Sequence, residues 1–155
     1  MEGRLYVIGM GPGSGEMMTP QAARALERCQ VIAGYTVYVE LLKERYPQAE
    51  FLTTPMTREE ERCRMALKRA AQGAQTAMVC SGDAGVYGMA GLILELAQEY
   101  PGVAVEIVPG ITAACAGAAI LGAPLMHDFA VISLSDRLTA LELIWKRVEL
   151  AAQGD

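Results

Sequence analysis

Residues 79–88 read VCSGDAGVYG, an apolar run that ends in a glycine-rich, acidic turn. A helix-period pattern follows at once, so we expect a strand, a tight turn and a helix that begins near Val86. α/β proteins use this arrangement to bring main chain close to a small ligand, because glycine has no side chain to keep the ligand away. The segment therefore predicts an α/β fold and a ligand-binding edge.

Two other segments have the same pattern. Residues 5–15 read LYVIGMGPGSG and residues 105–112 read VEIVPGIT, and in each an apolar run ends at a glycine turn. In a parallel sheet the carboxyl ends of the strands lie at one edge, where ligands bind. We therefore expect the three turns to form one shared crevice.

The rest of the chain alternates apolar runs with helix-period segments. This alternation predicts a mostly parallel sheet with flanking helices and right-handed crossovers. Several apolar runs carry β-branched residues in succession, as strands covered on both faces do. The expected strands are residues 5–9, 31–33, 50–52, 76–80, 103–108 and 129–134.

The expected helices have recognisable ends. Thr19 followed by Pro20 is typical of an N-cap with proline in the first turn. Thr57 and Thr139 each precede a glutamate by three residues, which is the spacing of a capping box. Glycines that favour a left-handed conformation follow three expected helix ends, at Gly73, Gly102 and Gly122.

The charge balance argues against a nucleic-acid partner. The 155 residues carry a formal net charge of −5, whereas nucleic-acid surfaces need clustered Lys and Arg. The five cations from Arg58 to Arg69 are offset by glutamates at positions 59–61. We interpret that stretch as a solvated helix face.

Cysteine and histidine usage argues against a metal centre. The four cysteines show no Cys-x-x-Cys spacing, and His127 is the single histidine. We expect buried or free thiols in a reducing, cytoplasmic compartment.

Targeting and membrane segments are not expected either. Residues 1–4 enter a strand pattern directly, without the features of a signal peptide. Residues 108–126 are uncharged, but prolines and glycines divide them into pieces too short to span a bilayer.

The glycine turns fit a ligand without phosphates better than a dinucleotide. Residues 9–14 read GMGPGS, so Ser14 occupies the third glycine position of the dinucleotide fingerprint. Pro12 removes a backbone donor that a pyrophosphate would use, and Gly34 stands where a ribose-binding acid is expected. A P-loop is excluded because the chain has no Gly-Lys-Ser/Thr.

S-adenosylmethionine has the groups that these turns suit. Main chain can bind its base, and Asp83 can accept from ribose hydroxyls or face the ammonium or sulfonium. The alternative is that Asp83 only caps the following helix in a tight turn. Three such turns at one edge favour a ligand.

The chain resembles the tetrapyrrole methylases, S-adenosylmethionine-dependent enzymes, along essentially its whole length. The strings that carry the resemblance are VIGMGPG (7–13), MTPQA (18–22), AGYTVY (33–38), CSGDAGVYGMA (80–90), PGITAA (109–114) and HDFAVISLSD (127–136). The fourth and last strings resemble the branch that methylates precorrin-3B or cobalt-factor III at C-17, with ring contraction, in cobalamin biosynthesis.

The resemblance implies a set of cofactor-binding residues: Pro12, Ser81, Gly82, Asp83, Val86, Thr112 and Ala113. It also implies a homodimer of subunits with two α/β domains. We expect a cofactor and substrate domain over residues 1–126 and the start of a second, largely missing domain over residues 127–155. Such a chain is expected to be inactive by itself, and its Phe129, Leu134 and Trp145 are expected to be exposed together with Leu125.

Methylation coupled to ring contraction can require a proton donor or acceptor. His127, Asp128 and Asp136 flank an expected strand at the domain junction and are the candidates. The alternative is a purely structural His-Asp pair.

Other functions remain open at this point. The same family could act at another ring position. A dinucleotide-binding oxidoreductase domain and a non-catalytic α/β module are the remaining alternatives.

Overall fold

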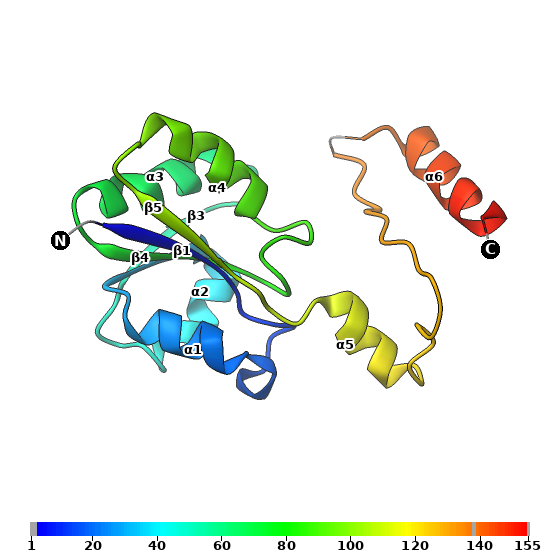
Figure 1. The fold of residues 1–155 in the computed structure, drawn as a ribbon, viewed down its shortest axis with the longest axis horizontal. Helices are drawn as coiled ribbons and strands as arrows, with labels where there is room; N and C mark the ends of the chain where they lie inside the picture. The colour runs from blue at the N-terminus through cyan, green and yellow to red at the C-terminus, as the bar shows by residue number, and fades with distance from the viewer. Residues whose placement is uncertain (1–2, 138, 155) are drawn as a thin grey trace. The chain divides into compact units, whose positions relative to one another are not determined.

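The computed structural model describes residues 3–137 and 139–154 (Figure 1). Among these, residues between Arg4 and Val108 form one parallel β-sheet. The first residues of the predicted domain 1–126 and the last residue of the predicted domain 127–155 lie outside these ranges. The strands are β1 (Arg4–Gly9), β2 (Val31–Tyr35), β3 (Glu50–Thr54), β4 (Gln75–Cys80) and β5 (Ala104–Val108). Their order in the sheet is β3-β2-β4-β1-β5, and every pairing is parallel. The predicted fold class is confirmed.

Five of the expected strands agree with the structure to within two residues at each end. The sixth expected strand, residues 129–134, is wrong: the structure assigns no strand there and pairs that segment with none of the described strands. Its nearly continuous apolar run, FAVISL, is suited to a strand, but a strand forms only where a neighbour completes its hydrogen-bonded ladder.

Alternate residues of β1 enter different cores. Tyr6 and Ile8 pack with α1 (Pro20–Glu27) and α2 (Thr36–Lys43) on one face of the sheet. Leu5 and Val7 pack with α3 (Glu59–Ala71) and α4 (Ala90–Leu96) on the other. Figure 1 shows these helices on the two sides of the sheet. Because both faces are covered, the inner strands β1, β2 and β4 are buried along nearly their whole length.

The remaining elements are the 3₁₀ turns η1 (Gly15–Met17) and η2 (Ala97–Glu99) and the helices α5 (Ala113–Ile120) and α6 (Leu141–Gln153). No helix within the described ranges has the length and apolar character needed to cross a bilayer.

The expected start of α1 is confirmed, and two other expected starts are wrong. The Thr19 hydroxyl accepts a hydrogen bond from Ala22 N at 3.1 Å, with Pro20 in the first turn. By contrast, α3 begins after Arg58 and α6 after Ala140, neither with a side-chain cap. Near α3, Thr57 takes φ +70° and donates its N–H to Glu59 Oε1, so the accepting glutamate lies two residues after the threonine and not three.

Two of the expected left-handed glycines are confirmed. Gly73 and Gly122 have φ of +94° and +87°. Gly102 does not adopt a positive φ, because the chain already leaves the helical path at Tyr100, where η2 ends with φ −128°.

Internal contacts divide the chain into two units, residues 1–116 and 117–155. The predicted domain boundary after residue 126 stays a prediction, because packing within this chain does not define where an independently folding domain ends.

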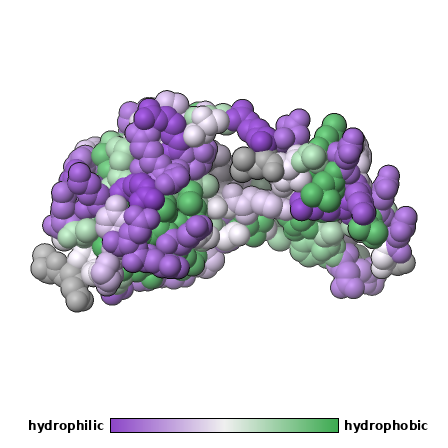
Figure 2. All heavy atoms as spheres, turned by 90° about the horizontal axis from the view of Figure 1, so that it is seen from above, coloured by the Kyte–Doolittle hydropathy of each residue, from purple (hydrophilic) through white to green (hydrophobic). Residues whose placement is uncertain are grey.

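The second unit carries many exposed apolar side chains. Ile144 of α6 is buried, whereas Phe129, Leu134 and Trp145 are 54%, 71% and 58% exposed and Leu125 is half-buried. The expected exposure is therefore confirmed for three of these four side chains. Figure 2 shows hydrophobic groups reaching the surface among hydrophilic ones.

Candidate functional site: the glycine turns at the carboxyl edge of the sheet

The three glycine turns lie side by side because β4, β1 and β5 are neighbours in the sheet. Gly11 N donates to Gly82 O at 3.0 Å, and Gly82 N donates to Gly11 O at 2.8 Å. From β1 the chain moves toward one edge of the sheet to form β2. Later, from β4, it moves toward the opposite edge and crosses β1 to form β5, so the direction of strand addition reverses. Ligands of open α/β sheets bind where the strand order reverses in this way. The expectation that the turns share one edge is confirmed, and the expectation that they form one ligand crevice stays a prediction.

Close main-chain packing explains Gly9, and a left-handed backbone conformation explains Gly82. A Cβ at Gly9 would lie 2.7 Å from both Gly110 N and Gly82 O, nearer than any side chain can approach. Gly82 itself has φ +67°, which favours glycine. These glycines are therefore needed to bring the turns together, whatever ligand the edge binds.

Asp83 fastens the turn after β4 to the turn after β5. Its Oδ1 accepts from Gly85 N at 2.8 Å and from Val86 N at 3.2 Å. Its Oδ2 accepts from Gly110 N at 2.8 Å, across 27 residues of sequence. Burial acts to raise the pKa of Asp83, but the three backbone N–H donors, that of Gly110 foremost, outweigh it and hold this pKa below its ordinary value.

The helix after this turn begins later than expected. It starts at Ala90 rather than near Val86, so the expected helix start is wrong. Tyr87 has φ +53°, which interrupts a helical path, and Met89 N donates to Cys80 Sγ at 3.3 Å. The residues between Asp83 and Ala90 therefore form a loop that folds back onto the end of β4.

All seven residues of the expected cofactor set lie in the first unit, in or next to the three turns. Ser81, Val86 and Ala113 are exposed, Pro12, Asp83 and Thr112 are half-buried, and Gly82 is buried. The edge thus offers exposed main chain, one carboxylate and small or apolar side chains. Their binding of a cofactor stays a prediction.

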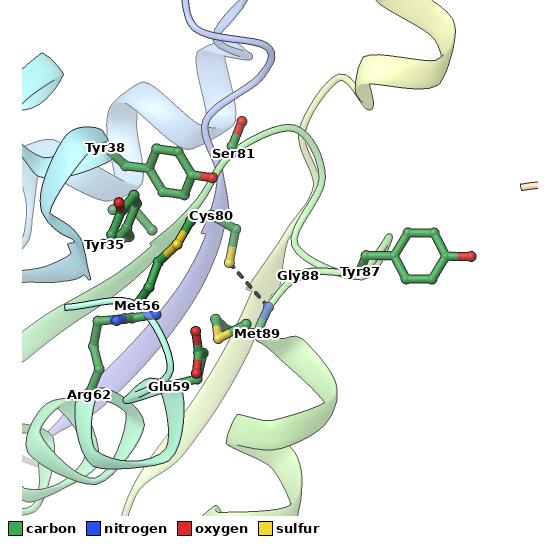
Figure 3. Close-up of a pocket in the computed structure, with 11 residues that line it drawn as sticks. Tyr35, Tyr38, Met56, Glu59, Arg62, Cys80, Ser81, Tyr87, Gly88 and Met89 are labelled. Carbon is green, nitrogen blue, oxygen red and sulfur yellow. Dashed lines mark hydrogen bonds between the residues drawn. The ribbon is translucent and has the colours of Figure 1, made fainter. Parts of the chain in front are cut away.

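A pocket of about 170 Å³ adjoins the turn after β4 (Figure 3). Ser81 belongs to it as well as to the expected set. Figure 3 shows Tyr87 pointing away from the other labelled side chains. The pocket is lined by Tyr35, Tyr38, Met56, Glu59, Arg62, Val79, Cys80, Ser81, Tyr87, Gly88 and Met89.

Sequence reasoning missed Arg62 at this pocket. It assigned the cations of α3 to a solvated face, which is wrong for this side chain, since Arg62 is only 4% exposed. The signal was its position: Arg62 precedes the buried Ala66 by four residues and therefore lies on the apolar stripe of α3.

The acid–base candidates belong to the second unit. His127 and Asp128 line a surface pocket with residues at the end of α6, among them Leu150 and Ala151. Asp136 is exposed and does not line that pocket. The structure thus brings two of the three candidates together, and their catalytic role stays a prediction.

Within the described ranges, no three His, Cys, Asp or Glu side chains gather as metal ligands would.

The sequence is similar to one protein family along nearly its whole length. The family model described as Tetrapyrrole (Corrin/Porphyrin) Methylases matches residues 4–154. The chain is 48% identical to the cobalt-factor III methyltransferase of Priestia megaterium, over 100% of the chain and 30% of that protein. It is 48% identical to the probable cobalt-factor III C(17)-methyltransferase of Salmonella typhimurium, over 97% of the chain and 63% of the relative. For the precorrin-3B C(17)-methyltransferase of a Sinorhizobium species, the identity is 44% over 99% of the chain and 62% of the relative.

Solved structures agree with the sequence comparison. The crystal structure of the methyltransferase CobJ has a TM-score of 0.90 and 40% identity, over 99% of this chain and 65% of that one. A uroporphyrin-III C-methyl transferase from Thermus thermophilus, complexed with S-adenosyl homocysteine, has a TM-score of 0.59 and 28% identity, over 74% of this chain and 48% of that one. The chain thus spans less than two thirds of the length of these curated relatives and solved structures.

Proposed function

The chain belongs to the tetrapyrrole (corrin/porphyrin) methylases, and we propose that it acts within an S-adenosylmethionine-dependent C-methyltransferase of cobalamin biosynthesis. The substrate is a corrin precursor, precorrin-3B or cobalt-factor III, and the methylated position is C-17, with contraction of the ring. The identities of 44–48% with relatives that carry these names support the choice within the family.

The observation that carries the proposal is the cluster of glycine turns fastened by Asp83. Its exposed main chain and single carboxylate suit an adenosine with a cationic tail, and Pro12 is poorly suited to a pyrophosphate. The Thermus relative holds S-adenosyl homocysteine, which supports the same ligand class. The residues we assign to the cofactor are Pro12, Ser81, Gly82, Asp83, Val86, Thr112 and Ala113.

The residues contribute mainly by positioning. S-adenosylmethionine supplies an already activated methyl group when bound, so alignment of the reactants and exclusion of water are the main tasks of the protein. The turns hold one reactant rigidly because hydrogen bonds join them to one another. We assign proton transfer in the ring contraction to His127 or Asp128, which line one pocket, with Asp136 as a further candidate.

We further propose that the protein is a cytoplasmic homodimer. The four cysteines are all free, which agrees with a reducing compartment. The dimer follows from the family resemblance, and sedimentation at micromolar concentration tests it.

Two measurements test the function. In calorimetry, the chain should bind S-adenosyl homocysteine and should not bind NADH. With cobalt-factor III or precorrin-3B as substrate of the intact gene product, mass spectrometry should show one added methyl group that comes from labelled S-adenosylmethionine. Tight binding of NADH in place of S-adenosyl homocysteine would overturn the proposal in favour of an oxidoreductase domain.

A further inference from the structure

Arg62 is a buried cation without a matching anion. It is 4% exposed, and no carboxylate of the described residues forms an ion pair with it. Its Nη1 donates to Thr54 Oγ1 at 2.6 Å and, at 3.4 Å, to the carbonyl oxygen of the same residue. Its Nε is buried and has no hydrogen-bond partner among the described residues. Buried charges are normally paired, so this arrangement calls for a missing partner.

The carboxylate that lines the pocket does not fill that role. Glu59 lines the same pocket, but its Oε1 accepts from Thr57 N at 3.1 Å. The neighbouring cations differ from Arg62: Arg58 is exposed, Arg64 is half-buried, and both are ion-paired with glutamates. Arg62 is therefore held inside the pocket by Thr54 and is available to a ligand.

The pocket has the size and lining of a subsite. At about 170 Å³ it is smaller than the roughly 300–1,000 Å³ of sites that enclose a whole ligand. The rings of Tyr35 and Tyr38 form one wall, with an edge-to-face contact at 5.5 Å between their centroids. Met56 and Tyr87 line it too, and they are 55% and 63% exposed. The site therefore suits a small anionic group that is attached to a larger apolar body lying outside.

We propose that this pocket holds one carboxylate arm of the tetrapyrrole, bound by the Arg62 guanidinium. The proposal rests on the proposed function, because corrin precursors carry carboxylate arms around an apolar ring. Guanidinium–carboxylate hydrogen bonds are strong and directional, so the contact would fix the orientation of the ring relative to Ser81, which belongs both to the pocket and to the cofactor edge.

The first test measures binding of uroporphyrin I, a soluble octacarboxylate, by fluorescence titration of the whole chain. Arg62→Met should weaken binding by about tenfold or more, because a charged hydrogen bond is lost. The matched control is Arg64→Met on the same helix, which should change binding by less than about twofold, since exposed pairs contribute little. A tetracationic porphyrin should bind more weakly than uroporphyrin. Acetate, added at the same concentration of carboxylate groups, should not displace bound uroporphyrin.

A second pair of variants covers the case in which Arg62→Met does not fold. Met56→Glu brings a carboxylate to the pocket, and it should raise the melting temperature and weaken uroporphyrin binding. Met56→Gln has the same shape without the charge, and it should do neither. The proposal is overturned if the two Met56 variants melt alike, if the two arginine variants bind alike, or if acetate competes equally.

Binding of S-adenosyl homocysteine to the same variants separates the two proposals. If the chain binds S-adenosyl homocysteine and the arginine variants bind uroporphyrin alike, the subsite is wrong and the proposed function stands. If the chain binds neither S-adenosyl homocysteine nor uroporphyrin, the proposed function and the arm subsite both fail.

Discussion

The Asp83 carboxylate accepts a hydrogen bond from Gly110 N at 2.8 Å and thereby joins the turns that follow β4 and β5. The same carboxylate accepts from two N–H groups of its own loop. Its main structural role is therefore to fasten two of the three turns of the proposed cofactor site. A variant of Asp83 should affect both the fold of this edge and the binding that depends on it.

Removal of this carboxylate should lower stability. Asp83→Ala leaves three backbone N–H groups without their acceptor and should reduce the free energy of unfolding by about 1–3 kcal/mol. Urea unfolding measures the change. Glu106→Ala is the control, since it breaks only the exposed ion pair with Arg4 and should cost less than about 1 kcal/mol. Equal losses in the two variants would contradict the role given to Asp83.

The same carboxylate should make stability depend on pH. The pKa of Asp83 in the folded chain lies below its ordinary value of 3.8. Its contribution is therefore complete well above pH 3.8 and is lost as the pH falls through the still lower pKa of the folded state. Urea unfolding from pH 7 to 3 should show the largest difference between wild type and Asp83→Asn near neutral pH. A difference that grows on acidification would show that the sign is wrong.

Two glycine-to-alanine variants should have opposite effects. Gly9→Ala places a methyl group 2.7–2.9 Å from main-chain atoms of the neighbouring turns and should be strongly destabilising. In contrast, Gly91 in α4 is exposed with nothing within 4 Å of an added Cβ. Gly91→Ala should therefore stabilise the chain by up to about 1 kcal/mol, because alanine favours a helix. Thermal melts of the two variants measure this, and a Gly9→Ala variant as stable as wild type would disprove the close packing of the turns.

The four thiols should differ in reactivity. Cys115 is exposed, while Cys29, Cys63 and Cys80 are buried. Burial raises the pKa of these three thiols to about 12, about 12 and about 11, so little thiolate is present at pH 8. A disulfide reagent should label one thiol of the native chain quickly, and Cys115→Ser should abolish that fast phase. Rapid labelling of more than one thiol would show that the buried cysteines are accessible.

The strands and the glycine edge follow from local sequence, because an apolar run and a glycine turn leave little choice of conformation. Asp83 was expected to contact the ligand, or alternatively to cap a helix from Val86. It caps no helix, because Tyr87 takes a left-handed conformation and delays the helix to Ala90. The strand expected at residues 129–134 depends on a partner strand, which no local pattern can supply. Arg62 was missed because its neighbours in sequence are solvated charges, whereas its own position on α3 faces the core.

Hydrogen–deuterium exchange of the whole chain, with and without saturating S-adenosyl homocysteine, tests the central proposal most directly. The proposed site predicts slower exchange at residues 81–86 and 110–113, and no such protection with NADH. Unchanged exchange in both segments, or protection confined to other parts of the chain, would contradict cofactor binding at the glycine turns.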